Sequence, residues 1–141
     1  MATLDLPNWE HLGRPRSFAG LMNLWESNFQ RMQRLLPDLN LKVDQARSIS
    51  QSDSPLYLDI LERNPYTLTL MLTYRLADQT ETPRLRVRIY RDAGVAQAMD
   101  AEPAEFGENL DRQWERNLLL NKWLDYCLEH GHGFALADHV S

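Results

Sequence analysis

The sequence predicts an α+β fold in which an antiparallel meander sheet of about four strands carries two long helices, N-terminal and C-terminal, packed on one face. Between residues 56 and 99, apolar side chains recur with a period of two, which is typical of half-buried strands. Before and after this region they recur three and four residues apart, the spacing of amphipathic helices. The 141 residues suit one core and show no long linker, so we expect a single domain over residues 1–141.

An irregular arm and a helix are predicted at the N-terminus. Residues 1–16 are interrupted by two prolines and a glycine, and their scattered apolar side chains are expected to pack across the body of the domain. Ser17 is a suitable N-cap, and the helix that it begins should run to about Leu36, because Pro37 ends it. The apolar residues of this helix form one stripe that we expect in the core: Phe18, Met22, Trp25, Phe29, Met32 and Leu36.

The strands are predicted to follow this helix. A short strand is expected at residues 39–43, and residues 48–55 should form a polar loop. Longer strands with short turns between them are then predicted at residues 56–63, 66–76, 84–91 and 95–99. Because the turns are short, consecutive strands should be antiparallel neighbours.

The last helix is predicted to begin after a loop at residues 100–107 and to end near Glu129, with Gly131 at the position where a glycine commonly ends a helix. One of its faces carries Leu110, Trp114, Asn117, Asn121, Leu124 and Leu128. The nearly opposite face carries Leu119, Trp123 and Tyr126. This second face either packs inside the domain or forms an interface with a protein partner or a second copy of the chain.

Composition argues against several kinds of partner and location. The net charge of −5 disfavours nucleic acids and membrane surfaces, because both attract a positive field. The apolar runs are far too short to span a membrane. One cysteine allows no intramolecular disulfide, and the N-terminus lacks the pattern of a secretory signal, so we expect a cytoplasmic protein.

Three stretches of the sequence are distinctive as a set. They are residues 64–70 (Asn-Pro-Tyr-Thr-Leu-Thr-Leu), residues 86–92 (Arg-Val-Arg-Ile-Tyr-Arg-Asp) and residues 114–124 (Trp-Glu-Arg-Asn-Leu-Leu-Leu-Asn-Lys-Trp-Leu). Together they resemble the YqiB-like bacterial family, which is domain-of-unknown-function family 1249, and the similarity extends over nearly the whole chain. The resemblance implies a cytoplasmic bacterial protein and brings no activity, cofactor or catalytic residue with it.

Arginines alternate along the strand predicted at residues 84–91, so they project from one face of the sheet. With their neighbours they form a hypothetical ligand-binding set: Arg75, Arg84, Arg86, Arg88 and Tyr90. Guanidinium groups are paired, permanently charged donors that suit phosphates and carboxylates, and a tyrosine can stack on a base. The same pattern also fits a solvated face on which Asp59 or Glu81 neutralises the arginines.

The strand predicted at residues 56–63 is expected to add Tyr57, Asp59 and Arg63 to this outer face. Asp59 and Glu62 should then fall on opposite faces, which makes them a poor acid–base pair. The sequence contains no phosphate-binding glycine loop, zinc-protease helix motif or serine-hydrolase elbow. These observations disfavour an enzyme and give no indication of a cofactor.

Cys127, His130, His132 and His139 are metal-ligand residue types within a short span. Their spacing is not a standard zinc pattern, and histidines near the end of a helix are favourable for electrostatic reasons alone. A catalytic role for Cys127 is disfavoured because the C-terminal end of a helix should raise the pKa of a thiol. No metal site is therefore predicted.

The sequence thus favours a small protein-interaction or regulatory module without catalytic activity. It would bind a protein partner, or a second copy of itself, through the last helix or the sheet face. The alternative is a binder of a small anionic ligand or nucleotide on the arginine-rich face.

Overall fold

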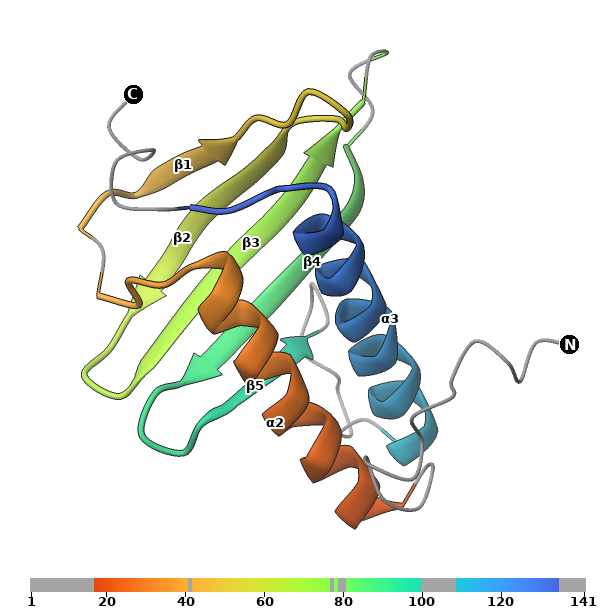
Figure 1. The fold of residues 1–141 in the computed structure, drawn as a ribbon. Helices are drawn as coiled ribbons and strands as arrows, with labels where there is room; N and C mark the ends of the chain where they lie inside the picture. The colour runs from red at the N-terminus through yellow and green to blue at the C-terminus, as the bar shows by residue number, and fades with distance from the viewer. Residues whose placement is uncertain (1–16, 41, 77, 79–80, 100–108, 135–141) are drawn as a thin grey trace, which may run out of the picture.

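The computed structural model describes residues 17–40, 42–76, 78, 81–99 and 109–134. In chain order its elements are α2 (Phe18–Leu35), β1 (Gln45–Ser48), β2 (Leu56–Arg63), β3 (Thr67–Arg75), β4 (Glu81–Tyr90), β5 (Val95–Met99) and α3 (Leu110–Glu129). The five described strands form one antiparallel sheet in the order β1-β2-β3-β4-β5, and both helices lie on the same side of it (Figure 1). The predicted α+β meander is confirmed, with five strands rather than about four. The arm predicted for residues 1–16 lies outside the described residues.

The strand predicted at residues 39–43 is wrong, and β1 takes its place a few residues later. The chain is still turning after the first helix, because the Asn40 N–H donates to the Asp38 side chain at 3.0 Å. β1 contains Ala46 as its one apolar residue, so no hydrophobic pattern marks it in the sequence. Its pairing with β2 defines it instead.

Helix α2 begins as predicted but presents a different face to the core. Ser17 caps it by accepting a hydrogen bond from the Gly20 N–H at 2.9 Å. The predicted core stripe is wrong in part, because Phe18 is 63% exposed and Met22 is 45% exposed. The buried residues are Gly20, Leu21, Leu24, Asn28, Met32 and Leu35. The polar Asn28 interrupts this face, and the periodicity therefore favoured the neighbouring apolar stripe.

Asn28 is buried because amide side chains join the two helices to each other. Its Nδ2 lies 3.4 Å from Oδ1 of Asn117, and Nδ2 of Asn121 donates to Oδ1 of Asn28 at 3.0 Å. Asn117 also donates to the Gln113 carbonyl and accepts the backbone N–H of Ala98 in β5, both at 2.8 Å. Each of these buried amides has partners, so together they align α2, α3 and β5.

Helix α3 follows its predicted course. Asn109 is its N-cap and accepts the Arg112 N–H at 2.8 Å. The helix ends at Glu129, and Gly131 has a φ of 84°, the left-handed conformation that the sequence predicts there. None of the described helices is long and apolar enough to cross a bilayer.

The two faces of the sheet differ because successive residues alternate between them. The inner face packs against the helices through a set of apolar residues: Leu56, Leu58, Leu68, Leu70, Leu72, Val87, Ile89, Ala96 and Ala98. No described element covers the outer face. Even so, Thr69, Met71 and Thr73 of the central strand are buried there, which means that long side chains of the neighbouring strands lie over them.

Candidate functional site

The outer face of the sheet brings arginines from several strands into register. The cross-strand rows read Arg47–Tyr57–Thr73–Arg84, Asp59–Met71–Arg86 and Glu62–Thr69–Arg88. Residues in such rows are direct neighbours on one face of the sheet. The outer face is therefore a surface on which positive groups of β1 and β4 flank the small and apolar side chains of β3.

The predicted arginine ladder on β4 is present, but its members have different surroundings. Arg88 Nε donates to Thr69 Oγ1 at 3.1 Å, and its Nη2 lies 4.0 Å from a carboxylate oxygen of Glu62. Arg86 is half-buried, and its Nε has no hydrogen-bond partner among the described residues. Arg84 is exposed. Arg88 is thus already paired, whereas Arg86 has a buried donor available.

A bulge in β2 changes which of its residues reach the outer face. The register shifts before Glu62, so Glu62 lies on the outer face opposite Thr69, and Arg63 does not lie there. The prediction that Asp59 and Glu62 occupy opposite faces is therefore wrong, as is the placement of Arg63 on the outer face. Arg63 instead pairs with Asp44 at 2.8 Å.

Arg47, Tyr57 and Arg84 lie in one cross-strand row of the outer face, with Thr73 between Tyr57 and Arg84. With Arg75 of the same face they form a set that we call the Tyr57 cluster. The guanidinium of Arg75 lies 4.2 Å from the centre of the Tyr57 ring, a cation–π contact. An open hollow of about 310 Å³ adjoins it, lined by Gln45, Ala46, Arg47 and Tyr57. Each of the cluster's three guanidinium groups stays charged at physiological pH.

The Tyr57 cluster overlaps only partly with the predicted ligand-binding set. Arg75 and Arg84 belong to both, and Tyr57 was expected on the outer face. Arg47 was missed because no strand was predicted at its position, and a four-residue polar strand leaves no detectable pattern. Tyr90 lies toward the opposite end of the outer face, where its hydroxyl is 3.5 Å from Oε1 of Gln97.

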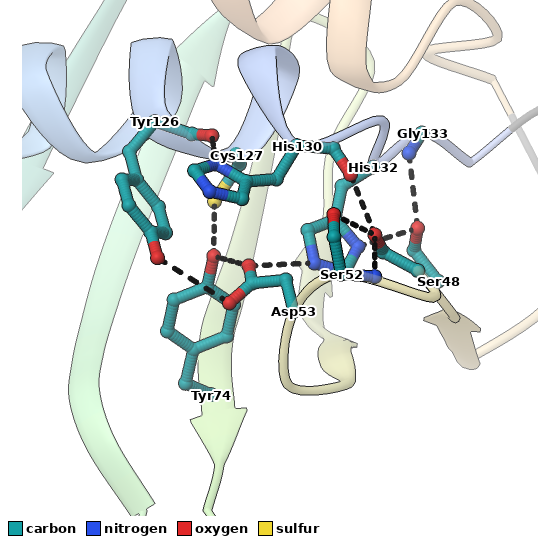
Figure 2. Close-up of polar contacts among 10 residues, drawn as sticks. Ser48, Ser52, Asp53, Tyr74, Tyr126, Cys127, His130, His132 and Gly133 are labelled. Atoms are coloured by element: carbon teal, nitrogen blue, oxygen red, sulfur yellow. Dashed lines mark hydrogen bonds and ion pairs between the residues drawn. The ribbon is translucent and has the colours of Figure 1, made fainter.

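A second polar cluster joins the loop after β1 to the end of α3 (Figure 2). Oγ of Ser48 lies 2.9 Å from Nδ1 of His132, and Nε2 of His132 lies 3.1 Å from an oxygen of Asp53. The Tyr74 hydroxyl donates to the same Asp53 oxygen, and the Gly133 N–H donates to Ser48 Oγ at 3.0 Å. A hydroxyl, an imidazole and a carboxylate are thus connected in sequence, as in a serine-hydrolase triad.

Burial and hydrogen bonding argue against catalysis at this second cluster. Ser48 is 5% exposed and His132 is 4% exposed, so neither faces a substrate. Ser48 Oγ accepts the Gly133 N–H and bonds to His132, so this oxygen already has two partners inside the protein. The imidazole also contacts the carboxylate through Nε2, whereas the triad uses Nδ1 for that contact. The arrangement is a clamp that fixes the loop to the end of α3.

The clamp changes the proton affinities of several groups. Burial alone would raise the pKa of Asp53, but hydrogen bonds from Tyr74, the Ser54 backbone and His132 outweigh it and hold that pKa below its ordinary value of 3.8. Burial and the bond to Asp53 raise the pKa of Tyr74. Burial raises the pKa of Cys127 to about 11, so its thiol stays protonated and is a poor nucleophile.

The cysteine and histidines near the end of α3 do not converge on one point. Cys127 is buried in the core, where its Sγ donates to the Tyr74 hydroxyl at 3.5 Å, and His132 belongs to the clamp. His130 stacks on Tyr126 with ring centres 4.0 Å apart. Within the part of the chain that the structure describes, no group of three His, Cys, Asp or Glu side chains is placed to hold a metal ion. His139 lies outside that part.

The residues of the predicted interface on α3 divide between core and surface. Trp123 is 6% exposed and packs edge-on against Tyr74, with ring centres 5.3 Å apart. Leu119 is 50% exposed and Tyr126 is 43% exposed. Trp123 therefore belongs to the core, and of the three residues Leu119 and Tyr126 remain open to a partner.

Fold and surface define the class: a small α+β protein with two helices on one sheet face and arginines in register on the other. The chain belongs to the family described as Protein of unknown function (DUF1249), whose profile matches residues 31–133, and this confirms the resemblance found in the sequence. It is 30% identical over 127 residues to Uncharacterized protein YqiB of Escherichia coli K12, which covers 81% of this chain and 90% of that protein. Uncharacterized protein YqiB of Escherichia coli O157:H7 matches to the same extent. No solved structure matches the chain.

Proposed function

We propose that this protein is a non-catalytic binding module that recognises an acidic segment of a partner protein on the outer face of its sheet. The Tyr57 cluster carries the proposal, because Arg47 and Tyr57 line an open hollow, Arg75 lies over the Tyr57 ring, and Arg84 lies in the same cross-strand row. Guanidinium groups form paired hydrogen bonds with carboxylates. Arginine and tyrosine are also the residue types in which the binding energy of interfaces concentrates.

A protein partner is favoured over a nucleic acid because the positive charge is local. The whole chain has a net charge of −5, so a long polyanion would meet repulsion beyond the cluster. On the outer face itself, carboxylates accompany the arginines beyond the Tyr57 cluster: Asp59 lies in the cross-strand row of Arg86, and Glu62 lies in the row of Arg88. A short acidic segment that places its carboxylates at Arg47 matches this pattern best.

Binding is favoured over catalysis because the acid–base groups of the clamp are buried and already bonded to one another. The raised pKa of the Cys127 thiol supports the same choice. A cytoplasmic location is part of the proposal, because a single free cysteine suits a reducing compartment.

The test measures binding of fluorescein-labelled hexaglutamate by fluorescence anisotropy. Arg47→Ala should weaken binding about fivefold, which corresponds to the loss of about 1 kcal/mol in one exposed charged contact. Arg34→Ala is the matched control, since Arg34 is an exposed arginine of α2 on the other side of the sheet. Equal affinities of all three proteins, or no binding to the wild type, would contradict the proposal.

The hollow favours a second candidate function, the binding of a small phosphorylated ligand such as a nucleotide. Its volume of about 310 Å³ lies at the lower end of the range for small-molecule sites, and Arg47 and Tyr57 line it. In a thermal-shift assay, ATP or pyrophosphate should then raise the melting temperature of the wild type, and Arg47→Ala should abolish the rise. No shift with either ligand would leave the acidic segment as the candidate.

A further inference from the structure

β1 forms one edge of the sheet, and one side of its backbone has no described partner. Among the described strands, β1 pairs with β2 alone. One residue before β1, the Ile60 N–H donates to the Asp44 carbonyl at 2.7 Å, in the register that pairs β1 with β2. Residues of an antiparallel ladder alternate between facing the partner strand and facing away from it. The N–H and C=O groups of Gln45 and Arg47 therefore point away from β2, and no described residue bonds to them.

The opposite edge of the sheet, β5, is treated differently. The Ala98 N–H points away from β4 and donates to Oδ1 of Asn117 in α3 at 2.8 Å. Both helices also pack against β5. Open strand edges attract further strands, and proteins commonly cover them. Within the described residues, this chain covers β5 with a buried side chain and leaves β1 uncovered.

We propose that the β1 edge takes up an extended acidic segment of a partner protein as an additional strand. The inference rests on the proposed function, because it specifies how the acidic partner reaches the Tyr57 cluster. An added strand bonds to the backbone of Gln45 and Arg47, and every second side chain then lies on the outer face beside the hollow. Carboxylates at those positions meet the Arg47 guanidinium. Ile49, which is 62% exposed directly after β1, provides an apolar contact at the end of the edge.

Charge favours an acidic segment over a second copy of this chain. Pairing two β1 edges would bring the two copies of Arg47 into opposite or diagonal positions, and like charges on neighbouring strands destabilise their pairing. An acidic strand replaces this repulsion with attraction.

Hydrogen exchange followed by NMR tests the strand addition on the full chain. The probe is an octapeptide in which glutamate and valine alternate. The Gln45 and Arg47 amides should exchange rapidly in the free protein and slow at least about tenfold when the peptide saturates it. The Ala46 and Ser48 amides, which face β2, should be slow in both states.

Two results of this experiment would overturn the inference. If the peptide binds and the Gln45 and Arg47 amides do not slow, the contact is made by side chains alone. If both amides are already protected before the peptide is added, another part of the chain or a second copy occupies the edge. Sedimentation at several concentrations then distinguishes those two occupants.

A backbone variant provides an independent test. Gln45→Pro removes an N–H that points to the open edge and keeps the bonds between β1 and β2, so it should weaken octapeptide binding about tenfold. Gln45→Ala removes the same side chain and keeps the N–H, so it should weaken binding clearly less than Gln45→Pro does. The same test can be made without changing the protein, using two octapeptides that are methylated on alternate sets of backbone nitrogens. Methylation of one set should abolish binding, and methylation of the other set should not. Equal binding of both would overturn strand addition.

The two proposals fail in different ways. If Arg47→Ala weakens octapeptide binding and Gln45→Pro does not, the acidic partner remains and strand addition is wrong. If neither variant changes binding, or if no peptide binds, both proposals are wrong.

Discussion

The carboxylate of Asp53 is the residue on which the clamp at the end of α3 depends. It accepts the hydroxyl of Tyr74 and lies 3.1 Å from Nε2 of His132, and its other oxygen is 3.5 Å from the Tyr126 hydroxyl. Asp53 and His132 are 79 positions apart in the chain, so their contact connects the loop after β1 with the segment after α3. An anionic acceptor with several donors stabilises the folded state more than a neutral one does.

We expect Asp53→Asn to lower the free energy of unfolding by about 1–2 kcal/mol at neutral pH, because hydrogen bonds to an anion are lost. The pKa of Asp53 in the folded protein lies below its ordinary value of 3.8, so this stabilisation is present above that value and is lost as the pH falls through the folded pKa. The difference between wild type and variant should therefore shrink in acid. Urea unfolding at a series of pH values measures it. A difference that stays constant down to about pH 2 would assign the acid titration to another group.

Among the elements, α2, α3 and β5 are aligned by buried amides rather than by apolar contacts alone. We expect Asn117→Ala to lower the free energy of unfolding by about 2–4 kcal/mol, because it leaves a cavity and removes the acceptor of the Ala98 N–H. Lys122→Ala, an exposed change on the same helix, should alter stability by less than about 0.5 kcal/mol. Urea denaturation compares the two variants, and equal stabilities would show that the amides do not align the helices.

The two sides of α3 make a second comparison within one element. Trp123→Ala should destabilise the protein by about 3–5 kcal/mol, because its ring is buried against Tyr74. Leu119→Ala should have an effect below about 1 kcal/mol, because half of that side chain is exposed. Thermal or urea unfolding measures both changes. If Trp123→Ala leaves the stability unchanged, the ring is not part of the core.

Each mistaken prediction for an element has a local physical cause. The face of α2 was misjudged because Asn28 is polar and yet buried, and its partners lie on a helix about ninety positions away. β1 was misplaced because a four-residue polar strand at an edge obtains its stability from pairing rather than from a pattern. The β2 bulge moved Glu62 to the outer face, and alternation alone gives no sign of a bulge.

For the molecule as a whole, patterning was sufficient to predict the architecture. The period of two along β3 and β4, the short turns and the two flanking helices predict an antiparallel meander with one covered face, and the structure has that fold. The candidate site was predicted less fully, because a site is made where segments meet. Arg84 and Arg75 could be placed on the outer face from the sequence, whereas Arg47 joins them only through the pairing of β1 with β2.

Net charge and local charge have opposite signs in this molecule, and the salt dependence of binding should show both. At an ionic strength of about 0.01 M the Debye length is about 30 Å, so an acidic peptide is repelled by the whole chain with its charge of −5. At about 0.1 M it is about 10 Å, and the arginines of the Tyr57 cluster dominate at contact. At about 1 M even this attraction is screened. The affinity for the glutamate–valine octapeptide should therefore pass through a maximum near 0.1 M salt, measured by anisotropy across that range.

Arg34→Ala should keep the maximum, whereas Arg47→Ala should flatten the decline at high salt. A steady fall in affinity from the lowest salt upward would mean that the peptide meets a positive field larger than this cluster, and the local mechanism would be wrong.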